Sequence, residues 1–439
     1  MKIDSCYNID KALQLRKSDS KTRHHLQLQL LQKHIANAMT IPFYRDLYGK
    51  LGVGPESVNH LDMLSYLPFT GRGDIDSQPT SFGKRDELSF RDIALTSGTT
   101  GEPVVVPYTE KDLLRLAFNE AMAFYSAGVR QGDRVLLTVT LDRCFVAGLA
   151  YYSGVTSLGA TAVRSGPGQA ARQWFLIEKL RPRVILGVPS FLLELGRWGR
   201  ENGYDVAGGS IAVIITIGEP IRRADFTLTD HGRQLEEIWG ARVHVSYGAT
   251  EFETAFGECS AGVGGHVHPE LMVVEIVDDN GHVLPEGQAG EVVVTPLGVE
   301  GFPLVRFKTG DIARLHVGTC PCGWTTPRLG PIEGRLAQRL KCKGTTLYPD
   351  TVFHALQDCV EVDGVYLEVR STMEGSDDLT VVVGCDDNAL DPGIIEERLQ
   401  ALLRVRPEVV VRGSAEVRAV MQGDGGRKLK KFFDLRVGT

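Results

Sequence analysis

Short apolar runs alternate with longer segments of helical pattern through the middle of the chain, from about residue 110 to residue 246. Such runs are typical of parallel strands that helices bury on both faces. The pattern therefore predicts a doubly wound, mostly parallel sheet, with ligands bound at the loops that leave the carboxyl ends of the strands. The predicted strands are 135–139, 160–163, 184–186, 211–217 and 243–245.

The pattern changes on either side of this sheet. Leucines at helical spacing over 22–40 predict an N-terminal helix, and Pro42 and Pro68 mark the joints that follow it. After about residue 270, short strands and hairpin signals such as Asn280-Gly281 predict a β-rich subdomain. The last hundred residues predict one helix near 393–404 and strands at 366–369, 379–383 and 409–411.

These patterns predict an α/β protein with two domains. Residues 1–334 form a large N-terminal domain of mostly parallel doubly wound sheets with a β-rich subdomain, and residues 335–439 form a small α+β C-terminal domain. A chain of 439 residues, 43% hydrophobic and 23% charged, is long enough for the two or three cores that this division requires.

The net charge and the cysteine content limit the classes of partner and the compartment that we expect. The net charge of -7 argues against a nucleic-acid or anionic-membrane partner, because both call for a basic face, and it favours a small-molecule substrate. No apolar run approaches the roughly 18 residues that cross a bilayer, and the first residues open no signal peptide. We therefore expect a cytoplasmic protein whose eight cysteines are reduced and serve a metal or chemistry rather than disulfides.

A loop rich in glycine and hydroxyl side chains precedes the apolar run 104–106. Its glycines let the backbone approach a ligand, and its hydroxyl and N–H groups can surround phosphate oxygens. It lacks the Gly-Lys-Ser/Thr ending of a Walker loop, and plain turns share its composition. The candidate phosphate-binding residues are Thr96, Ser97, Gly98, Thr99, Thr100 and Gly101.

Further short motifs follow this loop in a fixed order. Two of them stand at predicted strand ends, and the last lies close to the C-terminus. In chain order they are Gly218-Glu219-Pro220, Ser246-Tyr247-Gly248-Ala249-Thr250-Glu251, Lys308-Thr309-Gly310-Asp311, Gly334-Arg335 and Gly426-Arg427-Lys428. Each is an ordinary turn sequence when taken alone, so their order and spacing carry the signal.

In this order the motifs resemble those of the adenylate-forming enzyme superfamily, the acyl- and aryl-CoA synthetases and their relatives. The resemblance is closest to the phenylacetate–CoA ligase family and runs from about residue 20 to the end. The features of this narrower family are Pro42-Phe43-Tyr44-Arg45, Leu67-Pro68-Phe69-Thr70, Val104 after the loop, Cys320-Pro321-Cys322-Gly323 and Phe433-Asp434-Leu435-Arg436. The wider superfamily often has lysine where Val104 stands, which leaves phosphate binding to backbone donors.

The resemblance implies an ATP site. Tyr247 is expected to stack on adenine with Gly218, Glu219 and Pro220 as the opposite wall, and Thr250 to bond the α-phosphate. Glu251 is the expected Mg²⁺ ligand, since Mg²⁺ bridging phosphates takes one or two protein carboxylates; a solvated glutamate at a strand end is the alternative. Asp311 offers two oxygens to the ribose hydroxyls, supported by Arg335. Ser246 and Gly248 complete the nucleotide-binding set.

The C-terminal lysine motif implies the chemistry. Lys428 matches the family's catalytic lysine, whose ammonium lowers the repulsion between substrate carboxylate and α-phosphate; a solvated basic tail is the alternative. The family then rotates a mobile C-terminal domain about a hinge, so that a thiol reaches the acyl-adenylate. Many members have an acidic residue where Ala337 stands here. Gly344 lies in the loop that would line the pantetheine tunnel.

Four residues form a candidate metal site. Cys320 and Cys322 give two closely spaced thiolates, and Cys259 with His266 lies some sixty residues earlier. Three cysteines and one histidine are a structural zinc set. His268 is an alternative to His266, and three buried or idle cysteines are the alternative to a metal site.

Small and aromatic residues near two strand ends are candidates for the acid pocket. Such a lining suits a flat aryl acid better than a long acyl chain, although core packing explains the same residues. The candidates are Phe145, Ala147, Gly148, Phe252, Ala255 and Phe256.

The sequence therefore predicts a ligase that uses ATP and Mg²⁺ to convert an aryl or arylacetic acid into an acyl-adenylate and then a coenzyme A thioester. One alternative keeps the adenylation but loads the acyl group onto a carrier protein or another acceptor. A second alternative is a nucleotide-binding protein without ligase activity. The resemblance also implies a homodimer.

Overall fold

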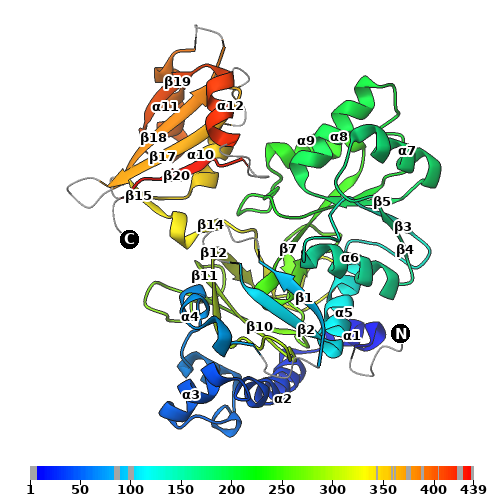
Figure 1. Cartoon of the computed structure of the whole chain (residues 1–439), viewed down its shortest axis with the longest axis vertical. Coiled ribbons are helices and arrows are strands. Elements are labelled where there is room, and N and C mark those ends of the chain that lie inside the picture. The colour runs from blue at the N-terminus through cyan, green and yellow to red at the C-terminus, as the bar shows by residue number, and fades with distance from the viewer. Residues whose placement is uncertain are drawn as a thin grey trace. The chain divides into compact units, whose positions relative to one another are not determined.

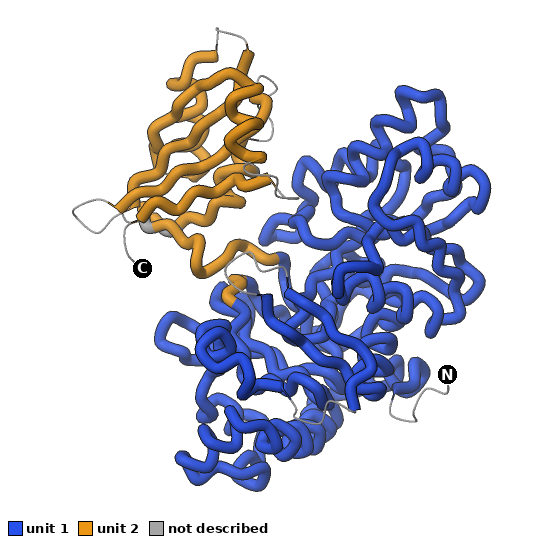
Figure 2. The backbone as a smooth tube through the Cα atoms, in the orientation of Figure 1, with its two compact units in different colours: residues 1–309, 313–331 blue, residues 310–312, 332–439 orange. Residues whose placement is uncertain are grey.

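A computed structural model of the chain describes residues 7–83, 89–96, 103–342, 345–356, 359, 362–371, 377–386, 390–403, 405–422 and 429–436. The chain divides into two compact units, shown in different colours in Figure 2. The first unit comprises Met1–Thr309 and Ala313–Pro331, and the second comprises Gly310–Ile312 and Ile332–Thr439.

Helices open the first unit. Helix α2 begins two residues before the predicted 22–40 helix because the side chain of Asp19 accepts a hydrogen bond from the Thr22 N–H and caps it. Pro42 is the first residue of the next helix, a position that needs no N–H. The helices are α1 (Ile9–Leu15), α2 (Ser20–Ala38), α3 (Pro42–Leu51) and α4 (Arg72–Ser77).

The predicted doubly wound sheet is present, which confirms the α/β fold class. Its strand order is β4-β3-β5-β6-β7-β8, with all neighbours parallel except β8, which folds back antiparallel to β7. The strands are β3 (Arg134–Leu137), β4 (Thr161–Arg164), β5 (Val184–Gly187), β6 (Val213–Thr216), β7 (Arg242–Ala249) and β8 (Thr254–Gly257). Strand β6 is shorter than the predicted 211–217.

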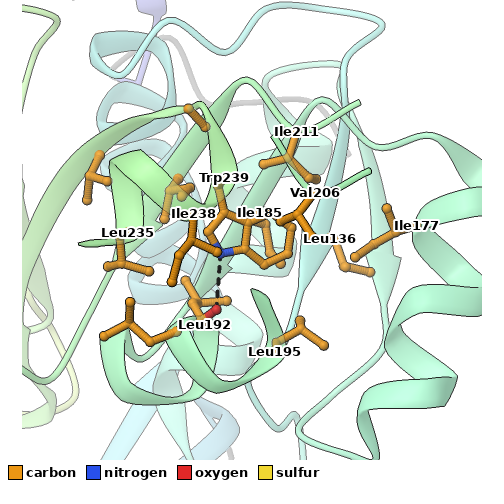
Figure 3. Close-up of a cluster of buried hydrophobic side chains, with 14 of the residues drawn as sticks. Leu136, Ile177, Ile185, Leu192, Leu195, Val206, Ile211, Leu235, Ile238 and Trp239 are labelled. Atoms are coloured by element: carbon orange, nitrogen blue, oxygen red, sulfur yellow. Dashed lines mark hydrogen bonds between the residues drawn. The ribbon is translucent and has the colours of Figure 1, made fainter. Parts of the chain in front are cut away.

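Helices cover both faces of this sheet (Figure 1). Helices α5 (Glu110–Ser126) and α6 (Val146–Ser157) pack on one face, and α7 (Ala170–Leu180), α8 (Pro189–Glu201) and α9 (Asp230–Trp239) pack on the other. Alternate strand residues serve the two cores, as Leu136 and Leu137 illustrate. Figure 3 shows Trp239 in the α7–α9 core, where its ring N–H donates to the Leu192 carbonyl at 3.0 Å.

The predicted β-rich region follows. Strands β9 (Gly265–His266), β10 (Met272–Val277), β11 (Ala289–Pro296), β12 (Phe307–His316) and β13 (Arg328–Leu329) form a sheet in the order β10-β11-β12-β13-β9. The hairpin signal is confirmed, since the Asp278 carboxylate accepts from the Asn280 N–H and Gly281 takes a left-handed φ of 83°. A separate hairpin joins β1 (Phe90–Leu95) to β2 (Val105–Thr109).

The second unit contains a four-stranded sheet in the order β19-β18-β17-β20. The strands and helices of this part of the chain are β14 (Gly334–Arg335), β15 (Leu340–Cys342), β16 (Thr345–Leu347), α10 (Pro349–Leu356), β17 (Val365–Ser371), β18 (Asp377–Gly384), α11 (Pro392–Leu403), β19 (Glu408–Arg412), α12 (Ser414–Gln422) and β20 (Phe432–Asp434). The predicted helix near 393–404 is present as α11. Helices α10 and α12 were not predicted, because they are too short to show a clear helical period in the sequence.

Candidate active site

The candidate phosphate loop connects β1 to β2, and two hydrogen bonds between Thr96 and Val104 hold the ends of these strands together. The hydroxyl of Thr96 accepts from the Val104 N–H at 2.9 Å, and the Val104 carbonyl accepts from the Thr96 N–H at 3.1 Å. The side chain of Val104 is buried, so the position where relatives often have lysine belongs to the core. Ser97, Gly98, Thr99, Thr100 and Gly101 lie outside the described residues.

The Gly-Glu-Pro motif follows β6. Gly218 has a left-handed φ of 77°, which glycine adopts without strain. The Glu219 carboxylate accepts hydrogen bonds from the N–H and the hydroxyl of Ser190, at 3.0 and 2.7 Å. Because Ser190 lies in the first turn of α8, the positive end of that helix also favours this carboxylate. Glu219 thus fixes the backbone of the motif.

Tyr247 lies on β7 and packs against two buried phenylalanines. Its ring centroid is 5.9 Å from that of Phe256, nearly parallel, and 6.1 Å from that of Phe252. Gly248 is required beside it, because an added Cβ would come within 2.8 Å of the Thr254 carbonyl oxygen. Phe252 and Phe256, both predicted to line the acid pocket, therefore pack against the Tyr247 ring, which is predicted to stack on adenine.

The predicted Mg²⁺ ligand meets a cation that the sequence analysis missed. Thr250 and Glu251 form a short 3₁₀ turn, η5 (Thr250–Phe252), directly after β7. The Glu251 Oε1 atom is 3.7 Å from Arg72 Nη1, and Arg72 Nε also donates to Asp76 at 2.7 Å. No motif marks Arg72, which lies at the start of α4 almost 180 residues earlier in the chain.

Asp311 and Arg335 meet in the second unit. They pair directly across strands β12 and β14, and Arg335 Nε is 3.2 Å from Asp311 Oδ1. The aspartate side chain is 9% exposed and the arginine side chain 59% exposed, so the buried carboxylate is fixed by a partner that faces solvent. The third predicted residue of the C-terminal part, Lys428, lies outside the described residues.

The predicted metal ligands come together in the first unit. Ligand atoms of Cys259, His266, Cys320 and Cys322 all lie within 4.8 Å of one another. The Cys259–Cys320 sulfur distance is 3.6 Å, and Cys322 Sγ is 3.4 Å from His266 Nε2. His266 Nδ1 is held by Thr326 Oγ1 at 2.9 Å, which leaves Nε2 facing the thiols.

The alternative ligand His268 is not part of this cluster. Its Nδ1 atom contacts the Arg16 guanidinium, and Arg16 also pairs with Glu270 at 2.7 Å. Both His268 and Arg16 are buried. Only His266 among the two candidates therefore lies with the cysteines.

The remaining acid-pocket candidates lie at the start of α6 and on β8. Phe145 precedes α6 and is 38% exposed, whereas Ala147 is half-buried. Gly148 is buried where an added Cβ would come within 1.9 Å of the Thr140 carbonyl oxygen, so only glycine fits. Ala255 is held by Asn119 of α5, whose side-chain oxygen accepts from the Ala255 N–H at 2.8 Å.

Two buried acids were not predicted. Burial raises the pKa of Glu120 on α5 to about 8, and burial raises the pKa of Glu253 well above its ordinary value. Both carboxylate oxygens of Glu253 lack a hydrogen-bond partner among the described residues, and its φ is left-handed at 50°. The available signal was a charged residue within an apolar stretch, which does not by itself distinguish a buried acid from an exposed one.

Comparison with known proteins identifies relatives over most of the chain. Residues 51–299 match the family model for the AMP-binding enzyme. The phenylacetate-coenzyme A ligase of Thermus thermophilus is 30% identical, over 94% of this chain and 96% of that one. The enzyme of the same name from Pseudomonas putida is 31% identical, over 76% and 75% of the two chains.

A solved structure shares the fold. The 2-hydroxyisobutyryl-CoA ligase in its postadenylation state superposes with a TM-score of 0.80 at 22% identity, over 95% of this chain and 90% of that one. The doubly wound sheet, its β-rich neighbour and the matched family model together define an adenylate-forming AMP-binding enzyme. The chain belongs to the phenylacetate–coenzyme A ligase family, which confirms the resemblance carried by the ordered motifs.

Proposed function

We propose that this protein is an AMP-forming acid–thiol ligase that activates an aryl or arylacetic acid and transfers it to coenzyme A. The observation that carries the proposal is the 30% identity with a phenylacetate-coenzyme A ligase over nearly the whole of both chains. In the first half-reaction a carboxylate oxygen attacks the α-phosphorus of ATP, and the bond to pyrophosphate breaks. In the second, the thiol loses its proton, its sulfur attacks the acyl carbon, and AMP leaves.

The proposed ATP site is assigned from the ordered motifs. Tyr247 stacks on adenine opposite residues 218–220, and Asp311 accepts hydrogen bonds from both ribose hydroxyls. The pairing of Asp311 with Arg335 supports this role, because the cation orients the buried carboxylate. Thr250 donates to the α-phosphate, and residues 96–101 surround the β- and γ-phosphates.

Glu251 is proposed as the protein ligand of Mg²⁺. Its side chain is only 17% exposed, and its Oε1 atom lies 3.7 Å from Arg72 Nη1, an ion-pair distance that is longer than a hydrogen bond. One carboxylate with phosphate oxygens is a typical Mg²⁺ environment. The ion, when bound, neutralises charge on the phosphates, and Arg72 holds the glutamate in place.

The two half-reactions are assigned to two domains, 1–334 for adenylation and 335–439 for the mobile C-terminal part. Lys428 brings its ammonium between carboxylate and α-phosphate during adenylation, and rotation of the C-terminal domain removes it before thioester formation. Ala337 stands at the hinge within the 3₁₀ turn η6 (Leu336–Gln338). A backbone hinge needs no acidic side chain, so rotation remains available here.

The cluster of Cys259, His266, Cys320 and Cys322 is proposed to hold a structural Zn²⁺. The sulfur–sulfur and sulfur–nitrogen distances of 3.6 and 3.4 Å suit ligands about 2.3 and 2.0 Å from a tetrahedral ion. Thr326 fixes the histidine from outside, as second partners of zinc ligands do. A closed site of four protein ligands supplies stability and leaves no position for substrate.

Compartment and assembly belong to the same proposal. Among the described residues no helix is long and apolar enough to cross a membrane. We assign the enzyme to the cytoplasm and to a homodimer; cell fractionation and light scattering of the purified protein test the two assignments. Coenzyme A is the proposed acceptor, and a carrier-protein thiol is the alternative that the assay below separates.

Pyrophosphate release tests the proposed function. The purified protein is mixed with ATP, Mg²⁺ and one acid at a time from a panel of aryl, arylacetic and short aliphatic acids, with and without coenzyme A. Release that an aryl acid triggers and coenzyme A accelerates supports the proposal. Release that coenzyme A leaves unchanged indicates another acceptor, and no release with any acid contradicts ligase activity.

A further inference from the structure

A small cavity lies between the sheet and helices α5 and α6 in the first unit. Its volume is about 10 Å³, which is room for about one water molecule or one substituent atom of similar size. Strands β7 and β8 form its floor, and Glu120 of α5 and Tyr151 of α6 close it from above. Most of its other lining is apolar.

Three polar atoms at this cavity have no hydrogen-bond partner among the described residues. They are Glu120 Oε2, His244 Nδ1 and Ser246 Oγ, and their side chains belong to residues only 3%, 4% and 5% exposed. An unpaired buried polar atom costs about 1–3 kcal/mol. Three of them around one small space therefore indicate a ligand group that pairs with them.

The carboxyl group of Glu120 is fixed in this place. An added Cβ on Gly154 of α6 would lie 2.3 Å from the Glu120 Cβ, so the two helices are in close contact where the glutamate leaves α5. Burial raises the pKa of Glu120 to about 8. At neutral pH the group is therefore a neutral carboxyl, which both donates and accepts a hydrogen bond.

The cavity adjoins elements that carry acid-pocket candidates, since its lining residues Tyr151 and Gly257 lie on α6 and β8. Tyr151 lies one helical turn beyond Ala147, on the same face of α6. On β7, Ser246 faces the opposite side of the strand from Tyr247 and stands four residues before Thr250, the proposed α-phosphate contact. Over the two residues from Ser246 to Gly248 the strand rises by about 6.6 Å. This length is close to that of a benzene ring with one substituent.

We propose that the acid substrate carries a hydroxyl or amino substituent on its ring, remote from the carboxylate, and that Glu120, Ser246 and His244 bind that substituent. The inference rests on the proposed function and assigns the substrate class of the same site. An unsubstituted ring would leave three buried polar atoms unpaired, and pockets built to bond such a group reject analogues that lack it. A hydroxyl and an amine share the required chemistry.

Matched acids test the inference. The rate of pyrophosphate release is measured as kcat/KM for phenylacetate and benzoate and for their hydroxy and amino derivatives at each ring position. We expect one substituted acid to exceed its unsubstituted parent by about 100-fold or more. Comparison of the hydroxy with the amino series then identifies which group the cavity binds.

Variants locate the preference at the cavity. Glu120→Leu and the milder Ser246→Ala should reduce the ratio of substituted to unsubstituted acid at least tenfold, whereas Glu120→Gln, which keeps a hydrogen-bonding group, should retain most of it. Gln173→Leu is the matched control, since Gln173 is a fully buried polar residue of α7 on the other face of the sheet. It should leave the ratio unchanged. Circular dichroism and thermal unfolding confirm that each variant is folded.

Two results would overturn the inference in distinguishable ways. If parent and substituted acids react equally well, or if Glu120→Leu lowers both rates equally, the cavity holds only a structural water and the ligase assignment stands. If no acid triggers release, the proposed function fails and the inference fails with it.

Discussion

Pairs of residues far apart in sequence set the chemistry of this site. Asp311 meets Arg335 because strands β12 and β14 pair residue to residue, and Glu251 meets Arg72 because a helix near the N-terminus reaches the end of β7. Local motifs made the two acids and Arg335 candidates. They did not identify Arg72, since an arginine at the start of a short helix has no distinctive neighbours in sequence.

Asp311→Asn should weaken ATP binding. The amide keeps the size of the side chain but loses the charge that bonds the ribose hydroxyls and attracts Arg335. We expect the KM for ATP to rise about 10- to 100-fold with little change in the KM for the acid. Asp278→Asn, in the exposed hairpin turn after β10, is the control. Equal changes in both KM values would contradict a role in nucleotide binding.

Lys428→Ala should separate the half-reactions. Loss of the ammonium that shields carboxylate from phosphate is expected to slow adenylation about 10²- to 10³-fold. Thioester formation from a supplied acyl-adenylate should be nearly unchanged. Lys430→Ala serves as the control, because Lys430 lies over the Phe433 ring at 4.8 Å. Equal losses in both half-reactions would show that the role of Lys428 is misassigned.

Glu120 should make stability depend on pH. Its carboxyl titrates near 4.5 when unfolded and at about 8 when folded, so the folded state binds more protons between these values. Its stabilising contribution is complete below pH 4.5 and is lost as the pH rises toward 8, by at most about 1.4 kcal/mol per pH unit. Glu120→Gln does not titrate, so it should gain stability over the native chain as the pH rises. Urea unfolding at pH 5, 6.5 and 8 measures the difference, and a constant difference would contradict the assignment.

At the scale of elements, the sequence predicted the presence of strands more accurately than their first and last residues. Apolar runs identified every parallel strand of the central sheet, because helices bury most of the strand side chains on both faces. The observed ends of an element differ from the predicted ends where a capping side chain sets its first residue, as Asp19 does for α2. The cavity at β7 could not be predicted, since it depends on Glu120, Tyr151 and Ser246 meeting from three different elements.

Zinc should stabilise the β-rich region. The four ligands join two parts of the chain that lie some sixty residues apart in sequence. One part is the segment after β8 together with strand β9, and the other is the turn between β12 and β13. We expect close to one zinc per chain by metal analysis, and Cys322→Ser should lower both the zinc content and the Tm by several degrees. Cys359→Ser, another half-buried cysteine, should change neither. Less than a tenth of an equivalent of zinc in untreated protein would contradict the site.

At the scale of the whole molecule, the candidate site residues are divided between two compact units. The first unit holds Tyr247, Glu251 and the candidate acid pocket, whereas Asp311 and Arg335 are described with the second. The sequence placed Asp311 in the N-terminal domain 1–334, whereas the structure groups it with the second unit, because β12 pairs with β14 at this point. The acid itself was not predictable, since the pocket residues are also good core residues.

Transfer of oxygen from the acid tests the central claim most directly. The substrate identified by pyrophosphate release is labelled with ¹⁸O in its carboxylate and converted in the presence of ATP, Mg²⁺ and coenzyme A. If the carboxylate attacks the α-phosphorus, one labelled oxygen must leave with AMP, and mass spectrometry should find AMP heavier by one ¹⁸O. Unlabelled AMP, or label in inorganic phosphate together with ADP, would contradict an acyl-adenylate route.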